Sequence, residues 1–329
     1  MKLVKKLIAG LFVASLICLY VVIYAVPGVT DVLTQTEILQ FGNLRITDDV
    51  TCYFVRDEKV YGAVRAGDIY YYVEDAVHVK KGAKILDVSF TSGGNANEES
   101  GYADIIARFG DDMTLLADFS TEFNGITSYY IDGYENYFTP GAMRGLKYDD
   151  VGRLVVLPVN VVRESTLKGE PLYKICNNRE WYMVCWVNGG DVAKYGVGKD
   201  VTVELSAGEV RATIIDIVED DDKWLIILKT NRYYEDFARV RSEPAKVVTS
   251  NYSGIIIRNE SITAKDGQAG VFIRTKSGAY VFTPIKIITT DGINSLAEVS
   301  YYTEDGSKVD TVKIYDEILR NPSRGQNRR

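Results

Sequence analysis

Short runs of β-forming residues separated by turn signals fill most of the chain from residue 34 to residue 318. The runs are rich in Val, Ile, Tyr and Thr, and the breaks between them carry Asp-Gly, Asn-Gly, Ser-Gly or clusters of Asp. This spacing is typical of sandwiches and barrels rather than of parallel sheets joined by helices, so we predict a mainly β fold. The expected strands cover residues 69–73, 84–90, 125–131, 181–187, 201–205, 210–218, 224–229, 253–258, 270–275, 280–289, 296–302 and 309–315.

An uncharged run of 20 residues, 7–26, lies near the N-terminus. As a helix it spans about 30 Å, the thickness of one hydrocarbon core. Three lysines precede the run, whereas the first charge after it is Asp31. The positive-inside rule therefore predicts a single-pass anchor in the cell membrane, with the N-terminus cytoplasmic and the bulk of the chain extracytoplasmic. A cleaved signal peptide is the alternative, but it has a shorter apolar core and a small-x-small cleavage site.

The composition of the 329 residues excludes several functional classes. The formal net charge of −7 repels nucleic acid, so we expect no nucleic-acid partner. The only histidine, His78, has no grouped ligands around it as zinc requires, and we interpret it as a strand surface residue. Ser165 and Lys168 match the bare Ser-x-x-Lys spacing but lack the motifs that accompany it in acylating enzymes. We therefore expect no catalytic residue, no metal site and no enzyme activity.

The four cysteines show no disulfide framework. Cys52, Cys176 and Cys185 follow the anchor, and Cys18 lies inside it. Three cysteines outside the anchor are an odd number, and none stands in a CxxC pair. We expect buried free thiols, with a Cys176–Cys185 bridge as the alternative.

Three stretches depart from the β pattern. Apolar residues at helical spacing predict a short helix or helical pair between about 100 and 120. Residues 91–100 are expected to be a loop, and residues 219–222, an acidic run, a solvated hairpin tip. The polar, basic residues 321–329 are expected to be a disordered tail. The helical stripe consists of Tyr102, Ile105, Ile106 and Phe109, with Met113, Leu116 and Ala117 as its continuation.

Two segments of the chain are similar to each other: residues 67–88, and residues 124–135 continued by 161–175. Each has a β run ending in Tyr-Tyr, an acidic turn, and then Lys-Gly before an aliphatic strand. The Lys-Gly turns are Lys81-Gly82 and Lys168-Gly169. Glycine suits a turn with positive φ, and the lysine keeps the turn in water. One copy cannot cover its own apolar face, whereas two interlocked copies can.

This repeated unit resembles a lipoyl-type barrel-sandwich hybrid cut into two half-motifs. The order of the segments resembles the HlyD-like membrane fusion proteins, also called periplasmic adaptor subunits, in particular a Gram-positive branch with a short or absent coiled-coil hairpin. Residues 174–187, 197–205, 253–273 and 312–322 resemble further parts of that family. The domains that the resemblance implies are a cytoplasmic tail (1–6), a transmembrane helix (7–26), a linker with the first membrane-proximal strand (27–49), a discontinuous barrel-sandwich hybrid (50–180, insertions at about 91–124 and 136–156), a β-barrel domain (181–252), a membrane-proximal β domain (253–318) and a disordered tail (319–329).

The resemblance implies a non-enzymatic adaptor that partners an inner-membrane exporter in transport or efflux, as a homo-oligomer. An envelope scaffold, or a cell-division or cell-wall accessory protein without transport activity, is the alternative, because residues 88–124 are too short and lack the heptads for a long coiled coil. No lysine stands at the expected hairpin tip, so we expect no lipoate, biotin or other cofactor. We expect Tyr71, Tyr129 and Trp186 to be interface aromatics.

Overall fold

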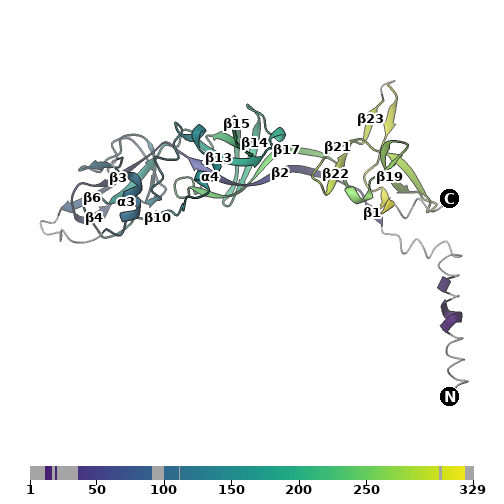
Figure 1. The fold of residues 1–329 in the computed structure, drawn as a ribbon, viewed down its shortest axis with the longest axis horizontal. Helices are drawn as coiled ribbons and strands as arrows, with labels where there is room; N and C mark the ends of the chain where they lie inside the picture. The colour runs from purple at the N-terminus through teal and green to yellow at the C-terminus, as the bar shows by residue number, and fades with distance from the viewer. Residues whose placement is uncertain are drawn as a thin grey trace, which may run out of the picture. The chain divides into compact units, whose positions relative to one another are not determined.

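Figure 1 shows the computed structural model of the chain, which describes residues 12–16, 19–20, 36–90, 100–110, 112–303 and 306–322. The chain divides into two compact units. We name residues 47–250 the barrel–sandwich unit, and residues 1–46 with 251–329 the terminal unit. Two long strands, β2 (Gln40–Val55) and β17 (Ser242–Arg258), each contribute residues to both units.

The expected membrane anchor falls mostly outside the described residues. Of residues 7–26, the structure describes 12–16 and 19–20, which are helical. Within the described part of the chain, no helix combines the length and the apolar character that a membrane crossing needs. Residues 91–99 of the expected loop and residues 323–329 of the expected tail also lie outside the described residues.

Ten strands build the sandwich part of the barrel–sandwich unit. They are β3 (Glu58–Ala63), β4 (Gly67–Tyr71), β5 (His78–Val79), β6 (Leu86–Phe90), β7 (Thr114–Leu116), β8 (Gly125–Ser128), β9 (Tyr130–Ile131), β10 (Val159–Asn160), β11 (Ser165–Thr166) and β12 (Pro171–Cys176). They form a five-stranded sheet in the order β5-β8-β12-β3-β7, a three-stranded sheet β11-β4-β6 and a ribbon β10-β9.

The two similar segments of the sequence interlock in these sheets. Strand β5 of the first segment pairs with β8 of the second, and β11 of the second pairs with β4 of the first. Each segment thereby covers the apolar face that the other exposes, since the buried residues of both pack into one core. That core includes Ile69, Val79, Ile85, Val88, Tyr129, Ile131, Leu172 and Ile175.

The helix α3 (Ala103–Phe109) lies against this core, close to β3, β4 and β6 (Figure 1). Ile105 and Phe109 are buried on its inner face, as the helical stripe predicts. The expected continuation of the helix is wrong. After Gly110, at φ 55°, the chain becomes extended, and β7 pairs in parallel with β3 instead. Backbone pairing with a neighbouring strand therefore overrides the helical spacing of Met113 and Leu116.

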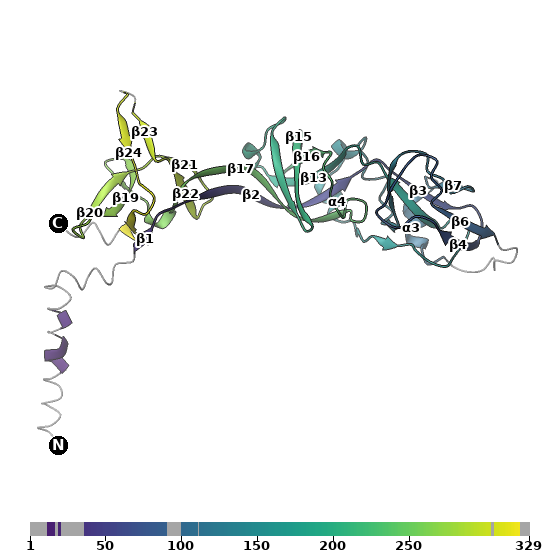
Figure 2. The same cartoon turned by 180° about the vertical axis from the view of Figure 1, so that it is seen from behind.

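Six strands close into a barrel in the rest of this unit. With β2 and β17 they are β13 (Trp181–Asn188), β14 (Asp200–Leu205), β15 (Gly208–Asp220) and β16 (Lys223–Thr230). The order is β14-β15-β16-β13-β2-β17, and β17 also pairs with β14, so no free edge is left in the ring. Figure 2 shows β13, β15 and β16 side by side. Alternate residues point inward, and the buried interior includes Cys52, Phe54, Trp181, Met183, Cys185, Val203, Ile214, Leu228 and Val247.

The insertion at residues 136–156 covers the outer face of this barrel. It holds the single-turn helices η1 (Met143–Gly145) and α4 (Tyr148–Val151). Its apolar side chains pack on outward-facing residues of β2, β13 and β16, and so form a second core on the outside of the sheet. The buried members of this second core are Val55, Phe138, Met143, Leu146, Val151, Val184, Trp186, Leu225 and Ile227.

The terminal unit is also mainly β. Its strands are β1 (Thr36–Ile38), β18 (Thr263–Lys265), β19 (Gln268–Arg274), β20 (Tyr280–Pro284), β21 (Ile287–Thr290), β22 (Asn294–Ala297), β23 (Ser300–Tyr302), β24 (Lys308–Asp310) and β25 (Glu317–Leu319). Strand β1 pairs with β25, which also pairs with β19, so residues near the two ends of the described range 36–322 meet in one sheet. A small core that includes Leu39, Ile257, Val271 and Ile318 holds the unit together.

The two Lys-Gly turns of the similar segments adopt the same backbone conformation. Gly82 has φ 81° and Gly169 has φ 83°, both in the left-handed region, and Lys81 and Lys168 are exposed. The Gly82 N–H donates to the carbonyl of Thr121 at 2.8 Å. No atom lies within 4 Å of a Cβ built at either glycine, so only the backbone conformation restricts the residue type.

We predict that Gly82→Ala and Gly169→Ala each lower the free energy of unfolding by about 1–2 kcal/mol, the cost of left-handed backbone for a residue with a Cβ. Urea unfolding of the full-length chain in detergent measures this cost. The control is Gly141→Ala, at an exposed glycine with an equally open Cβ position and no positive φ. That change should leave stability equal or slightly higher. An equal loss in all three variants would contradict the role of the turns.

Candidate functional site

Six charged side chains are buried together in the barrel–sandwich unit, where the chain crosses between its barrel and its sandwich. Three are cationic and three are anionic, so their formal charges balance. We name this set the buried ion cluster. Its members are Arg56, Glu58, Asp132, Glu135, Lys174 and Arg241, and no side chain among them is more than 1% exposed.

The ends of the strands bring these residues together. Arg56 follows β2 and Glu58 opens β3, so both lie at the first crossing from barrel to sandwich. Lys174 reaches the same place because β12 pairs with β3. Arg241 directly precedes β17, at the return into the barrel. The cluster therefore joins segments that are far apart in the sequence.

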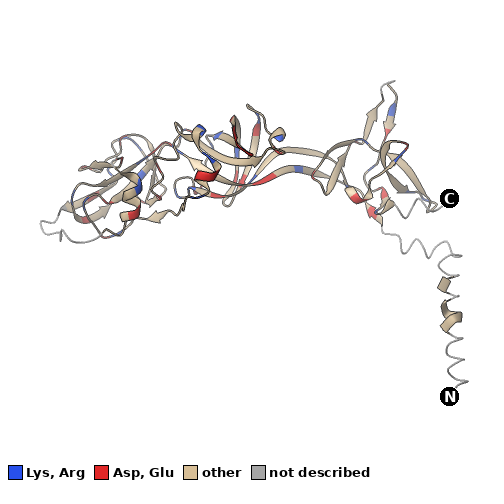
Figure 3. Cartoon of the chain, in the orientation of Figure 1, with Lys and Arg blue, Asp and Glu red and all other residues tan. Residues whose placement is uncertain are grey.

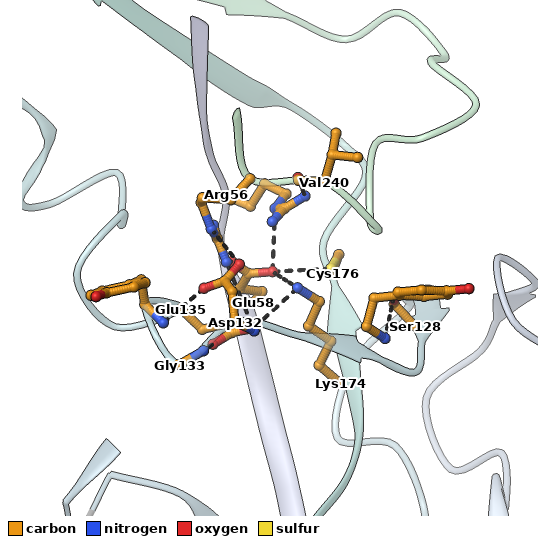
Figure 4. A network of polar contacts seen from close by, with 12 residues as sticks. Arg56, Glu58, Ser128, Asp132, Gly133, Glu135, Lys174, Cys176 and Val240 are labelled. Atoms are coloured by element: carbon orange, nitrogen blue, oxygen red, sulfur yellow. Dashed lines mark hydrogen bonds and ion pairs between the residues drawn. The ribbon is translucent and has the colours of Figure 1, made fainter. Parts of the chain in front are cut away.

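Glu58 lies at the centre of the cluster (Figure 4). Arg56 Nε and Lys174 Nζ each lie 3.2 Å from Glu58 Oε2, and the Cys176 thiol donates to the same oxygen at 3.3 Å. The Arg241 guanidinium pairs with the other carboxylate oxygen, Oε1. One carboxylate thus contacts all three cations, a geometry that compensates for their removal from water.

The remaining anions lie in the turn after β9. Arg241 Nε lies 2.9 Å from Asp132 Oδ2, and Lys174 Nζ lies 3.2 Å from Glu135 Oε1. The Glu135 carboxylate also accepts hydrogen bonds from the N–H groups of Asp132, at 3.1 Å, and Gly133, at 2.9 Å. This turn leads directly into the insertion, so the cluster also fixes where the insertion begins.

The electrostatics keep the central groups charged. Burial alone would raise the pKa of Glu58, but Arg241, Arg56 and Lys174 together hold that pKa far below its usual range. Burial would likewise lower the pKa of Lys174, but Glu58 and Glu135 raise it above the ordinary value. For the Cys176 thiol, burial and the nearby Glu58 carboxylate outweigh the effect of Lys174 and Arg56, and its pKa rises to about 12. A buried network of this kind tolerates the loss of no single member, because the partner left behind keeps its charge without compensation.

A second polar contact attaches the insertion to the barrel. One Asp220 carboxylate oxygen, Oδ2, accepts from the Tyr148 backbone N–H at 2.7 Å and from Trp186 Nε1 at 2.9 Å. Lys147 Nζ lies 3.1 Å from the other oxygen. Burial would raise the pKa of Asp220, but these donors hold it below its ordinary value. The expected solvated tip at 219–222 is therefore wrong for Asp220, which is 4% exposed, because the insertion folds over it.

The expected interface aromatics lie inside the barrel–sandwich unit. Tyr129 is 3% and Trp186 is 8% exposed, so neither ring offers a surface to another molecule. Trp186 faces the insertion, which occupies the side of β13 opposite to Trp181. Tyr71 is half-buried, packs edge-on to Tyr129 with ring centroids 5.2 Å apart, and donates from its hydroxyl to the Arg163 carbonyl at 3.2 Å. The interface expected for these aromatics is thus internal to the chain.

The other residues that the sequence offered as candidates for catalysis or metal binding are exposed. His78 is exposed in β5, and Ser165 and Lys168 are exposed in and after β11. Within the described ranges, no group of three or more His, Cys, Asp or Glu side chains could hold a metal ion. Figure 3 shows Lys and Arg interspersed with Asp and Glu along the described parts of the ribbon.

Two surface features of the barrel–sandwich unit are open to other molecules. A groove of about 970 Å³ runs beside the insertion and is lined by acidic side chains such as Asp49 and Asp149 and by aromatic ones such as Tyr148. On the sandwich, residues 155, 157 and 159 of an extended segment expose aliphatic side chains. Val155 is 62% and Leu157 is 67% exposed, and only the end of this segment, β10, pairs with another strand.

Family models match both parts of the barrel–sandwich unit. A model described as an RND related, barrel-sandwich hybrid domain matches residues 58–177, and one described as an RND related, beta-barrel domain matches residues 181–251. The fold and these two domains define a protein with the domain architecture of a membrane fusion adaptor. Both models are described as RND related, and together they cover more than half of the chain. The expected resemblance to membrane fusion proteins is confirmed.

Solved structures match the chain at low sequence identity. MacA from Actinobacillus actinomycetemcomitans has 12% identity and a TM-score of 0.37, over 87% of this chain and 99% of that one. ZneB from Cupriavidus metallidurans has 12% identity and a TM-score of 0.30, over 88% and 92%. The membrane fusion protein Spr0693 from Streptococcus pneumoniae R6 has 10% identity and a TM-score of 0.28, over 61% and 97%. No curated protein matches the chain. The assignment of the two domains rests on the two domain models.

We predict that Lys174→Met lowers the free energy of unfolding by about 3–5 kcal/mol, because it leaves Glu58 and Glu135 buried without their shared lysine. Urea unfolding of the full-length chain in detergent measures the change. The control is Lys168→Met, at an exposed lysine in the turn before β12. It should change stability by about 0.5 kcal/mol or less. Equal effects of the two substitutions would show that the cluster is dispensable.

The lowered pKa of Glu58 predicts a pH-dependent difference between the wild type and Glu58→Gln. A carboxyl with a folded-state pKa below its unfolded value contributes stability above the unfolded pKa, about 4.3, and that contribution declines as the pH falls toward the folded-state pKa. Unfolding at pH 7 and pH 3 should therefore give a larger difference at pH 7. Glu74→Gln, at an exposed carboxyl, should give no such trend. A difference that stays constant or grows on acidification would contradict the prediction.

Proposed function

We propose that the chain is a non-enzymatic, membrane-anchored extracytoplasmic adaptor of the membrane fusion type that partners an inner-membrane exporter. The observation that carries the proposal is the pair of RND-related domains, matched in the order sandwich and then barrel. The apolar run at residues 7–26, ahead of both domains, supports anchoring in the membrane that would also hold the exporter.

The junction between the two domains supports a mechanical role. An adaptor acts through its surfaces and through the fixed geometry that presents them. The buried ion cluster ties β3, β12, the turn after β9 and the start of β17 to one another, so a change of angle at the junction would separate buried charges. We infer that the sandwich and the barrel of this unit move as one body when the adaptor engages its partner.

We also propose that the adaptor is a homo-oligomer. The segment at residues 155–159 supports this, because its exposed aliphatic side chains and largely unpaired backbone resemble an open sheet edge that could pair with another strand. A contact between copies would bury Val155, Leu157 and Val159, which are 62%, 67% and 40% exposed.

A second function is favoured by the size of the insertion between the half-motifs. Its only helix within the described residues, α3, has 7 residues, so this insertion supplies no long coiled-coil hairpin in the part of the chain described. An envelope scaffold, or a cell-division or cell-wall accessory protein, would need the rigid two-domain unit and the anchor but no such hairpin.

The test is covalent capture of the full-length chain in its own membrane. A photo-crosslinking residue replaces Leu157 in one strain and Val197, which is 65% exposed on the barrel side, in another. The captured proteins are identified by mass spectrometry after affinity purification. The two positions are alike in exposure and side-chain type, so they distinguish a specific contact from random collision.

We expect a transporter permease among the captured proteins, and crosslinks between copies of this chain at position 157 but not at position 197. Capture of division or wall-synthesis proteins without any permease would overturn the exporter partnership and support the scaffold function. Equal self-crosslinking at both positions would contradict the proposed contact surface.

A further inference from the structure

Two buried cysteines lie opposite each other on neighbouring strands of the barrel. Strands β13 and β2 pair antiparallel, with Met183 opposite Phe54 and Val184 opposite Tyr53. The same register, continued by one residue, places Cys185 opposite Cys52. Both cysteines are fully buried and belong to the core inside the barrel.

The hydrogen-bond pattern shows which kind of strand pair this is. The Phe54 N–H donates to the Arg241 carbonyl at 2.7 Å, on the side of β2 away from β13. Backbone direction alternates along a strand, so Cys52, two residues earlier, also directs its N–H and C=O away from β13. Cys52 and Cys185 are therefore a non-hydrogen-bonded pair. In such pairs the Cα atoms are about 4.5 Å apart, within the range of about 4.4–6.8 Å that disulfides need.

The side chains share one face as well. Inward-facing residues of β13 include Met183 and Cys185, and inward-facing residues of β2 include Cys52 and Phe54, whereas Val184 and Tyr53 face the outer core. The neighbouring Cys185 side chain, together with burial, raises the pKa of Cys52 well above its usual value, as expected for two adjacent thiols.

The third cysteine of the barrel–sandwich unit, Cys176, has a different environment. The Cys176 thiol donates to Glu58 in the buried ion cluster. It lies in β12, which pairs with β3 and β8 and not with β2 or β13. The strands therefore bring Cys52 and Cys185 together and leave Cys176 apart. The Cys176–Cys185 bridge, which the sequence left open as an alternative, is not the pair that the strands form.

We propose that Cys52 and Cys185 are an oxidisable dithiol that closes into a disulfide across β2 and β13. The oxidant is an external disulfide, either a small molecule or a thiol–disulfide oxidoreductase. One cysteine thiolate attacks it to form a mixed disulfide and releases one thiol. The second cysteine then displaces the other thiol, so that two protons and two electrons leave the pair and the oxidant is reduced to two thiols. Because both cysteines are buried in the closed barrel, the exchange takes place before the barrel closes or during its local opening.

The bridge would join two strands that come from distant parts of the chain and meet only in the folded barrel. Its formation therefore depends on native pairing, since unfolded chains offer Cys176 as an equal competitor. The proposal rests on the barrel alone and is independent of the proposed adaptor function. If the chain is exported, its barrel lies in an oxidising compartment, where disulfides persist.

The test is disulfide mapping of the full-length chain. The reduced protein, in detergent, is refolded in buffers of reduced and oxidised glutathione at a series of ratios. It is then quenched with acid, denatured, alkylated and analysed by mass spectrometry before and after digestion. The reduced chain should take four alkyl groups, one for each cysteine. The oxidised chain should take two, lose about 2 Da before alkylation for the two hydrogens removed, and yield one linked peptide pair containing Cys52 and Cys185.

Single substitutions distinguish a native pair from random oxidation. Cys176→Ser should leave the Cys52–Cys185 linkage at the wild-type yield. Cys52→Ser should abolish the linkage and leave Cys185 alkylated, not transferred to Cys176. Full alkylation of Cys52 and Cys185 at every oxidant ratio in the wild-type chain would overturn the proposal, as would a main bridge that involves Cys176. Because the wild-type result is decisive without any variant, a substitution that prevents folding does not obscure the outcome.

Discussion

The buried ion cluster is the constraint on which the barrel–sandwich unit depends. Its cations and anions come from the end of β2, the start of β3, the turn after β9, strand β12 and the residue before β17. A buried charge without a partner costs several kcal/mol, so no one of these segments can leave its place while the others stay. Apolar packing alone would hold the barrel and the sandwich as two cores. The shared charges make their junction specific.

The insertion at residues 136–156 extends this constraint to the outside of the barrel. It begins directly after Glu135, a member of the cluster, and its Tyr148 backbone N–H binds Asp220 of β15. Its apolar side chains bury Trp186 and the other outward-facing residues of the sheet. A sheet face that would otherwise be an exposed apolar patch is thereby converted into an internal interface. The edge segment near Leu157 and the groove near Tyr148 stay accessible to other molecules.

Local patterns explain which parts of the fold the sequence could predict. Alternation locates strands such as β14, and the stripe of Ile105 and Phe109 locates α3, because both periodicities follow from local backbone geometry. The helical continuation beyond Gly110 is wrong because parallel pairing with β3 decides the conformation there. The cluster itself had only a weak local signal. Lys174 is the one charged residue of strand β12, but nothing in the sequence shows that it meets Glu58.

The sequence by itself determined the mainly β class, the two similar segments with their Lys-Gly turns, and the order of domains that the family models share. These depend on side-chain period, on glycine at positive φ and on the order of segments along the chain. Only the tertiary structure decided that Arg241 pairs with Glu58, that Trp186 faces the insertion, and that Cys185 faces Cys52. Each of these contacts joins residues more than about thirty positions apart, and only strand pairing and the closure of the barrel bring such residues together.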